Sequence, residues 1–118
     1  MKSKLKIAVA THKKFQMPSQ SCYFPLHVGK GSLRAHKLSE YVGDNTGENI
    51  SDRNPYYCEL TGLYWIWKNM ESEYVGMVHY RRYFRTLNKC HSKNRMEYIL
   101  TEEEACRLLE KYDILLPK

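Results

Sequence analysis

Residues 74–84 read Tyr-Val-Gly-Met-Val-His-Tyr-Arg-Arg-Tyr-Phe. The first part of this segment, residues 74–78, is a short apolar run with the length and β-branched content of a buried strand. The run ends abruptly in an imidazole, a phenol and two guanidinium groups. A strand delivers such groups to one edge of a sheet, and ligands of open α/β sheets bind at that edge. The segment therefore predicts a strand end that binds an anionic or phosphorylated ligand.

The same pattern occurs near the N-terminus, where residues 4–10 predict a first strand that ends in Thr11, His12 and Lys13. Between these two strands, Asn54 and Pro55 resemble the N-cap and first residue of a helix that we expect to reach residue 69. Apolar side chains recur in it at helical spacing. They predict a buried face made of Leu60, Leu63, Tyr64 and Trp67, with Ile66 and Met70 beside it.

Other segments complete an alternating pattern of strands and helices. Residues 22–28 predict a short strand, which Pro25 confines to a sheet edge or an extended loop, and residues 32–41 predict a short helix. Thr101 and Glu104 form the capping box of a helix that turns Ala105, Leu108 and Leu109 inward. Residues 113–116 predict a last buried strand. This alternation indicates an α/β fold with an at least partly parallel sheet.

The chain of 118 residues suffices for one domain, 1–118. A last strand without a helix to cover it suggests part of a larger domain, or a core that another chain completes. The net charge is +6 but dispersed, and no nucleic-acid-binding motif occurs. The four cysteines form no Cys-x-x-Cys pair, which disfavours a zinc site. No secretion signal or membrane-spanning run occurs, so we expect reduced thiols and a cytoplasmic protein.

Three polar segments converge in this scheme if the first strand and the strand at 74–78 are parallel neighbours. They are residues 11–13, residues 79–82 and the polar loop 44–54. Arginine holds phosphate through paired, charge-assisted hydrogen bonds, so the edge formed by these segments suits a phosphorylated ligand. Two alternatives remain open. The arginine pair can instead neutralise Glu59, Glu71 or Glu73, and His79 can be a satisfied core histidine.

Several segments of the chain resemble one bacterial family. They are Ala10–Lys13, Gly43–Ser51, Asn54–Thr61 with Tyr64 and Trp65, and Val78–Phe84. The family is the DUF4422 domain, found among capsular and exopolysaccharide biosynthesis proteins. The match runs in order along nearly the whole chain. Members look like glycosyltransferases, some associated with galactofuranose, and their domains are longer than this chain. The resemblance implies a GT-A-type fold, a Rossmann-like α/β sandwich that would be incomplete at its C-terminus here.

The resemblance also implies a site. The donor nucleotide, sugar and diphosphate would contact ten residues, namely Thr11, His12, Asp44, Asn45, Thr46, Asn49, His79, Tyr80, Arg81 and Arg82. Asp44 and Glu59 are the candidates for a catalytic base. Many GT-A enzymes hold a divalent metal with an Asp-x-Asp pair, but no such pair occurs in this chain. We therefore expect cationic side chains to replace the metal at the leaving diphosphate, although a divalent metal is not excluded.

The expected partners are a nucleotide-sugar donor, UDP-linked by preference, and a glycan or lipid-linked acceptor, with no nucleic acid. Such a protein would work in the cytoplasm, at the inner face of the cytoplasmic membrane if it associates peripherally. The truncated chain would lack activity if the missing part holds the base. The alternative function is a non-catalytic module that binds nucleotides or polyanions.

Overall fold

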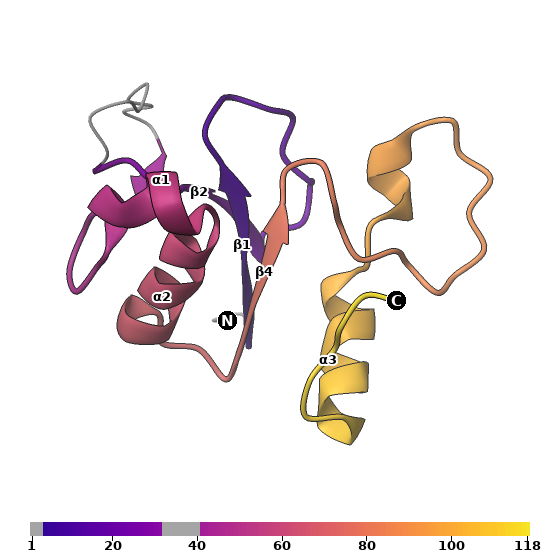
Figure 1. Ribbon diagram of the computed structural model, residues 1–118. Helices are drawn as coiled ribbons and strands as arrows, with labels where there is room; N and C mark the ends of the chain where they lie inside the picture. The colour runs from indigo at the N-terminus through magenta and orange to yellow at the C-terminus, as the bar shows by residue number, and fades with distance from the viewer. Residues whose placement is uncertain (1–3, 32–40) are drawn as a thin grey trace.

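A computed structural model describes residues 4–31 and 41–118 (Figure 1). Its centre is a sheet of parallel strands in the order β3-β2-β1-β4. The strands are β1 (Leu5–Thr11), β2 (Tyr23–His27), β3 (Val42–Gly43) and β4 (Tyr74–His79). In the register, Val9 of β1 lies beside Pro25 of β2 and Val78 of β4. The α/β fold class and the parallel pairing of the first strand with the strand at 74–79 are thus confirmed.

Helices cover both faces of the sheet (Figure 1). Successive residues of β1 point to opposite faces. Ile7 and Val9 join the buried cluster that includes Ala105 of α3 (Glu102–Lys111), whereas Ala8 and Ala10 join the cluster with Trp65 and Ile66 of α2 (Leu60–Asn69). The remaining elements are short: η1 (Ser51–Arg53), α1 (Asn54–Tyr57) and η2 (Arg95–Tyr98). No helix within residues 4–31 and 41–118 is long and apolar enough to cross a bilayer.

The predicted start of α3 is confirmed. The Thr101 hydroxyl accepts a hydrogen bond from the Glu104 amide (3.1 Å), and the Glu104 carboxylate accepts one from the Thr101 amide (3.3 Å). The same carboxylate is buried and also accepts from the Leu87 amide (2.8 Å) and the Thr86 hydroxyl. It therefore fastens the segment after β4 to the start of α3. As predicted, Ala105 faces inward.

The predicted helix from residue 55 to residue 69 is wrong in one respect, because Cys58 interrupts it. Cys58 has a φ of 51°, which ends α1 before α2 begins at Leu60. The expected capping by Asn54 is also wrong. Its amide nitrogen instead donates to the carbonyl oxygen of Cys58 (2.8 Å) and to the hydroxyl of Thr61 (3.1 Å). The side chain thus bridges the two helices.

The predicted buried face of α2 is wrong. Thr61, Gly62, Trp65 and Ile66 are buried, whereas Leu60, Leu63 and Trp67 are exposed, Trp67 to 70%. The cause is the close approach of the helix to the sheet. A Cβ atom on Gly62 would lie 2.6 Å from Cγ1 of Val28. The helix can therefore pack this closely on the sheet only through the side that carries Gly62.

Three further predictions differ from the structure. Residues 22–28 do contain a strand, but β2 lies inside the sheet, between β3 and β1. Among the described residues, β3 pairs only with Leu26 and His27 of β2, so Pro25 needs no hydrogen-bond partner on that side. β4 is one of the two edge strands of the described sheet, so Val75 is exposed. Residues 113–116 form no strand, and Ile114 and Leu116 are exposed. The predicted helix at 32–41 falls almost wholly outside the described residues.

Candidate functional site

The carboxyl ends of the four strands lie at one edge of the sheet, because the strands are parallel. From β1 the chain adds β2 and β3 on one side, whereas β4 lies on the other side of β1. In open α/β sheets, the crevice where the strand order reverses is the usual ligand site. Here the crevice lies between the ends of β1 and β4, and residues 11–13 and 79–82 flank it.

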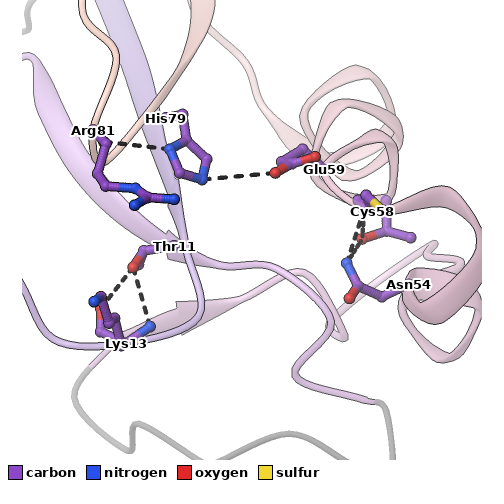
Figure 2. Close-up of polar contacts among 8 residues, drawn as sticks. Thr11, Lys13, Asn54, Cys58, Glu59, His79 and Arg81 are labelled. Carbon is purple, nitrogen blue, oxygen red and sulfur yellow. Dashed lines mark hydrogen bonds and ion pairs between the residues drawn. The ribbon is translucent and has the colours of Figure 1, made fainter.

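Thr11 shapes the β1 side of the crevice. Its side chain is buried, and its hydroxyl donates to the Lys13 carbonyl oxygen (2.6 Å) and accepts from the Lys13 amide (3.1 Å) (Figure 2). These bonds turn the chain sharply at the strand end and leave His12 and Lys13 exposed. Both predicted residues, Thr11 and His12, thus lie at the crevice, but the Thr11 hydroxyl is engaged within the chain.

A tight turn closes the β4 side. The His79 amide donates to the Arg82 carbonyl oxygen (3.2 Å), and the Arg82 amide donates to that of His79 (2.8 Å). The side chains of Arg81 and Arg82 are exposed, and within the described residues neither forms an ion pair with a carboxylate. The alternative in which the arginines neutralise acidic neighbours therefore finds no support in the described part of the chain.

Glu59, just before α2, faces His79 of β4 (Figure 2). Oε1 of Glu59 lies 3.6 Å from Nε2 of His79. Nδ1 of His79 accepts from the Arg81 amide (3.3 Å), which places the proton of a neutral imidazole on Nε2, toward Glu59. Burial lowers the pKa of His79, and the Glu59 carboxylate opposes this shift. The net downward shift favours the neutral imidazole.

A strained backbone position fixes the direction of Glu59. The positive φ of Cys58 is uncommon for a residue with a side chain. Its carbonyl oxygen accepts from the Asn54 amide nitrogen (2.8 Å) and from the backbone amide of Thr61 (3.2 Å), which hold the break in place. Strain of this kind is often found next to functional groups. The break places the Glu59 carboxylate beside β4 rather than along the side of a continuous helix.

A cavity of about 1080 Å³ opens at this edge of the sheet. Its size suits a nucleotide-sized ligand. The lining combines basic, aromatic and aliphatic residues with one acidic side chain, and it includes Glu59, His79, Arg81, Arg82, Tyr83 and Phe84. The sequence pattern singled out the first four of these, and Tyr83 and Phe84 belong to the same segment. Lys118, which also lines the cavity, carried no sequence signal that would have selected it.

Asp44, a candidate for both donor binding and catalysis, is fully buried. Its carboxylate accepts from the amides of Gly29 (2.9 Å) and Lys30 (3.2 Å), from the Thr61 hydroxyl (2.6 Å) and from the Ser51 hydroxyl. Four donors occupy most of the lone pairs of a carboxylate. The structure therefore gives Asp44 a structural role beneath the turn after β2, away from the cavity lining.

The three remaining loop candidates are also separate from the cavity. The Thr46 hydroxyl accepts from the indole nitrogen of Trp65 (3.0 Å), and the Asn49 carboxamide oxygen accepts from the Ser51 amide (3.2 Å). Asn45 is exposed. Of the predicted residues, His79, Arg81, Arg82 and Glu59 line the cavity. Thr11, His12 and Tyr80 are not in its lining but lie beside it, where the rings of His12 and Tyr80 are in contact. Contact of this loop with a donor remains a prediction.

His27, the last residue of β2, was not among the residues predicted from the sequence. Its side chain is fully buried, and within the described residues neither ring nitrogen has a hydrogen-bond partner. Burial lowers its pKa, as do the charges of Lys30 and His12, whereas Asp44 raises it. Sequence offers little signal for such a residue, because a histidine at a strand end is more often exposed or paired.

We expect His27 to make the fold acid-sensitive. The unfolded chain binds a proton at His27 below about pH 6.5, whereas the folded protein binds it only at a lower pH, so stability is present above about pH 6.5 and falls as the pH decreases. The loss should approach about 1.4 kcal/mol per pH unit. Urea unfolding between pH 5 and 7.5 checks this. His27→Leu should flatten the dependence, and an unchanged slope in that variant would contradict the assignment.

The residues at this edge do not fit a divalent metal. Mg²⁺ and similar ions require several oxygen ligands, but Asp44 is saturated by protein donors, and among the described residues Glu59 is the one acidic residue that lines the cavity. In the described parts of the chain, no group of three or more histidine, cysteine or acidic side chains is arranged to hold a metal ion. The exposed charges beside Glu59 are cationic instead.

The fold and the crevice together define an α/β protein whose parallel sheet presents a basic edge. The chain belongs to the family of the domain of unknown function DUF4422, whose model matches residues 6–118. This match confirms the resemblance seen in the sequence. None of the curated proteins compared with the chain matches it.

Among solved structures, the chain is similar to the apo structure of WbbM, a bifunctional glycosyltransferase. The two share 35% sequence identity and superpose with a TM-score of 0.75. The likeness covers 97% of this chain but 22% of the WbbM chain. The chain thus spans about a fifth of that protein's length, and the α/β fold class is shared with part of a glycosyltransferase.

Proposed function

We propose that this chain forms the donor-binding part of a glycosyltransferase, which moves a sugar from a nucleotide-diphosphate donor to a glycan. One observation carries the proposal. Two exposed arginines, Arg81 and Arg82, are not paired with carboxylates in the described residues and line a cavity at the crevice between β1 and β4. The similarity to part of WbbM supports a transferase.

The chemistry follows from the charges of this edge. Breaking the bond between sugar and diphosphate leaves negative charge on the departing phosphate, and preorganised cations stabilise that charge. Arg81 and Arg82 supply them without a metal. A general base must also accept the proton of the attacking acceptor hydroxyl. Glu59 suits this role, since it lines the same cavity and is half exposed.

The donor we propose is UDP-linked, and the acceptor is a growing capsular, exopolysaccharide or lipopolysaccharide glycan, free or linked to lipid. A hexose, including galactofuranose, is the transferred sugar. Work on such an acceptor would place the protein in the cytoplasm, at the inner face of the membrane. The second candidate is a module that binds nucleotides without chemistry. It is favoured by the hydrogen bonds that engage Asp44 within the fold, because they remove one of the two candidate catalytic bases and leave only Glu59 among the described residues of the cavity lining.

The proposal predicts saturable UDP binding that depends on the arginine pair. Arg81→Ala and Arg82→Ala should each weaken UDP binding about 10- to 100-fold, the worth of charge-assisted hydrogen bonds. Isothermal titration calorimetry measures this. Arg107→Ala, an exposed arginine of α3 outside the cavity lining, is the matched control and should bind UDP normally.

Three outcomes would contradict the proposal. Normal UDP binding in both variants with lowered stability would make the arginines structural. Strict dependence of transfer on Mg²⁺ or Mn²⁺ would show that the cations do not replace a metal. Binding of any polyanion with similar affinity, falling steeply with salt, would instead indicate a nonspecific electrostatic surface.

A further inference from the structure

The ring of Tyr80 lies where the ends of β1 and β4 meet. Its backbone amide donates to the Ala10 carbonyl oxygen (3.1 Å), which ties it to β1. Its ring contacts His12 edge-on at 5.8 Å between centroids, and Phe15 and His79 at 5.8 and 4.5 Å. Tyr80 therefore lies between side chains from both sides of the crevice.

Two cations approach this ring from the two sides of the crevice. The ammonium nitrogen of Lys13, after β1, lies 5.3 Å from the ring centroid, and the guanidinium carbon of Arg81, after β4, lies 5.4 Å from it. Both distances fall within the range of cation–π attraction. Within the described residues, neither cation forms an ion pair with a carboxylate. The crevice thus gathers two positive charges around one aromatic ring without a protein anion between them.

We propose that Lys13 and Arg81 form a diphosphate clamp across the ring of Tyr80, with Lys13 supplying the β1 half. The inference rests on the proposed function and deepens it, because it assigns the donor diphosphate to the junction of the two strand ends. Arginine offers paired donors to one phosphate, and lysine offers a compact charge to the other. Tyr80 is a positioning residue that holds both cations at the crevice.

The turn made by Thr11 explains how Lys13 reaches this position. The Thr11 hydroxyl bonds both the amide and the carbonyl oxygen of Lys13, so the backbone of Lys13 is fixed while its side chain stays exposed. The backbone of Arg81 is likewise fixed by its bond to Nδ1 of His79 (Figure 2). Two fixed backbones whose cationic side chains are exposed to solvent suit a charged ligand that arrives from solvent.

The test compares ligands that differ in phosphate content. Isothermal titration at constant ionic strength measures the affinities of uridine, UMP, UDP and inorganic diphosphate. Lys13→Ala should weaken UDP and diphosphate binding about tenfold or more and leave uridine binding unchanged. Lys13→Arg should restore most of the UDP affinity. Lys68→Ala is the matched control, since Lys68 also lies over an aromatic ring, 3.6 Å from the Trp67 centroid, outside the crevice.

The outcomes separate this inference from the proposed function. If Arg81→Ala weakens UDP binding but Lys13→Ala does not, the clamp is wrong and the proposed donor site stands. Equal losses for uridine and UDP in Lys13→Ala would also overturn the clamp, because Lys13 would then act on the nucleoside or on the fold. If the unsubstituted protein binds neither UDP nor diphosphate, both the clamp and the proposed function fail.

Discussion

Asp44→Ala is expected to destabilise the fold by about 4 kcal/mol, because each buried donor left without a partner costs about 1–3 kcal/mol. The donors include the Gly29 amide and the Thr61 hydroxyl, which belong to the turn after β2 and to α2. Losing them together would loosen the contact between these elements. This is a large fraction of the roughly 5–15 kcal/mol that stabilises a typical domain. Urea unfolding followed by circular dichroism measures the change.

Asp52→Ala is the control for this prediction. Asp52 is an exposed aspartate in the same segment, and its loss should change stability by no more than about 0.5 kcal/mol. Asp44→Asn should also destabilise, because its amide group would present a donor to neighbours that are themselves donors. A variant Asp44→Ala that stays as stable as the parent but no longer binds UDP would restore Asp44 as a donor ligand.

Glu59→Gln is expected to lower kcat by about 10²–10⁴-fold, the usual worth of a general base. The substitution preserves the shape of the side chain, so UDP affinity should change little. The assay measures the release of UDP from a UDP-hexose donor in the presence of acceptor. It uses a form of the protein that shows measurable transferase activity. The acidic limb of the pH–rate profile should disappear in the variant, because the group that must be ionised is gone.

Glu48→Gln is the matched control. Its carboxylate is exposed, bonds the Tyr64 hydroxyl (3.1 Å) and lies outside the cavity lining, so turnover should be unchanged. If Glu59 merely orients His79, then Glu59→Gln would retain turnover, since a glutamine carboxamide oxygen can face Nε2 of the imidazole in the same way. Retained turnover would therefore move the search for the base elsewhere in the protein.

The sequence predicts the parts of this fold that depend on neighbours along the chain. The apolar run at 74–78 and the capping box of Thr101 and Glu104 are local patterns, and both appear in the structure. The meeting of residues 11–13 with residues 79–82 followed from one assumption, that the two strands are parallel neighbours. Strand ends of a parallel sheet share an edge, so the basic side of the site could be predicted.

The rest depends on contacts between distant segments. Almost every side of α2 is apolar, and the close fit of Gly62 against Val28 selects the side that is buried. The loop at 44–54 is rich in short polar side chains, which suit a ligand and a buried hydrogen-bond network equally well. The partners of Asp44 at Gly29 and Thr61 decide between these roles, and no local pattern reveals them.

The pairing of β1 with β4 has a consequence for the time at which the protein can fold. Leu5 pairs with Tyr74, and Ala10 with His79, so the ribosome must add all the intervening residues before β1 gains its second neighbour. At roughly 5–20 residues per second, this delay is on the order of 3–14 s. During that interval the apolar residues of β1 remain accessible to chaperones and to other nascent chains. The crevice between the two strands has not yet formed.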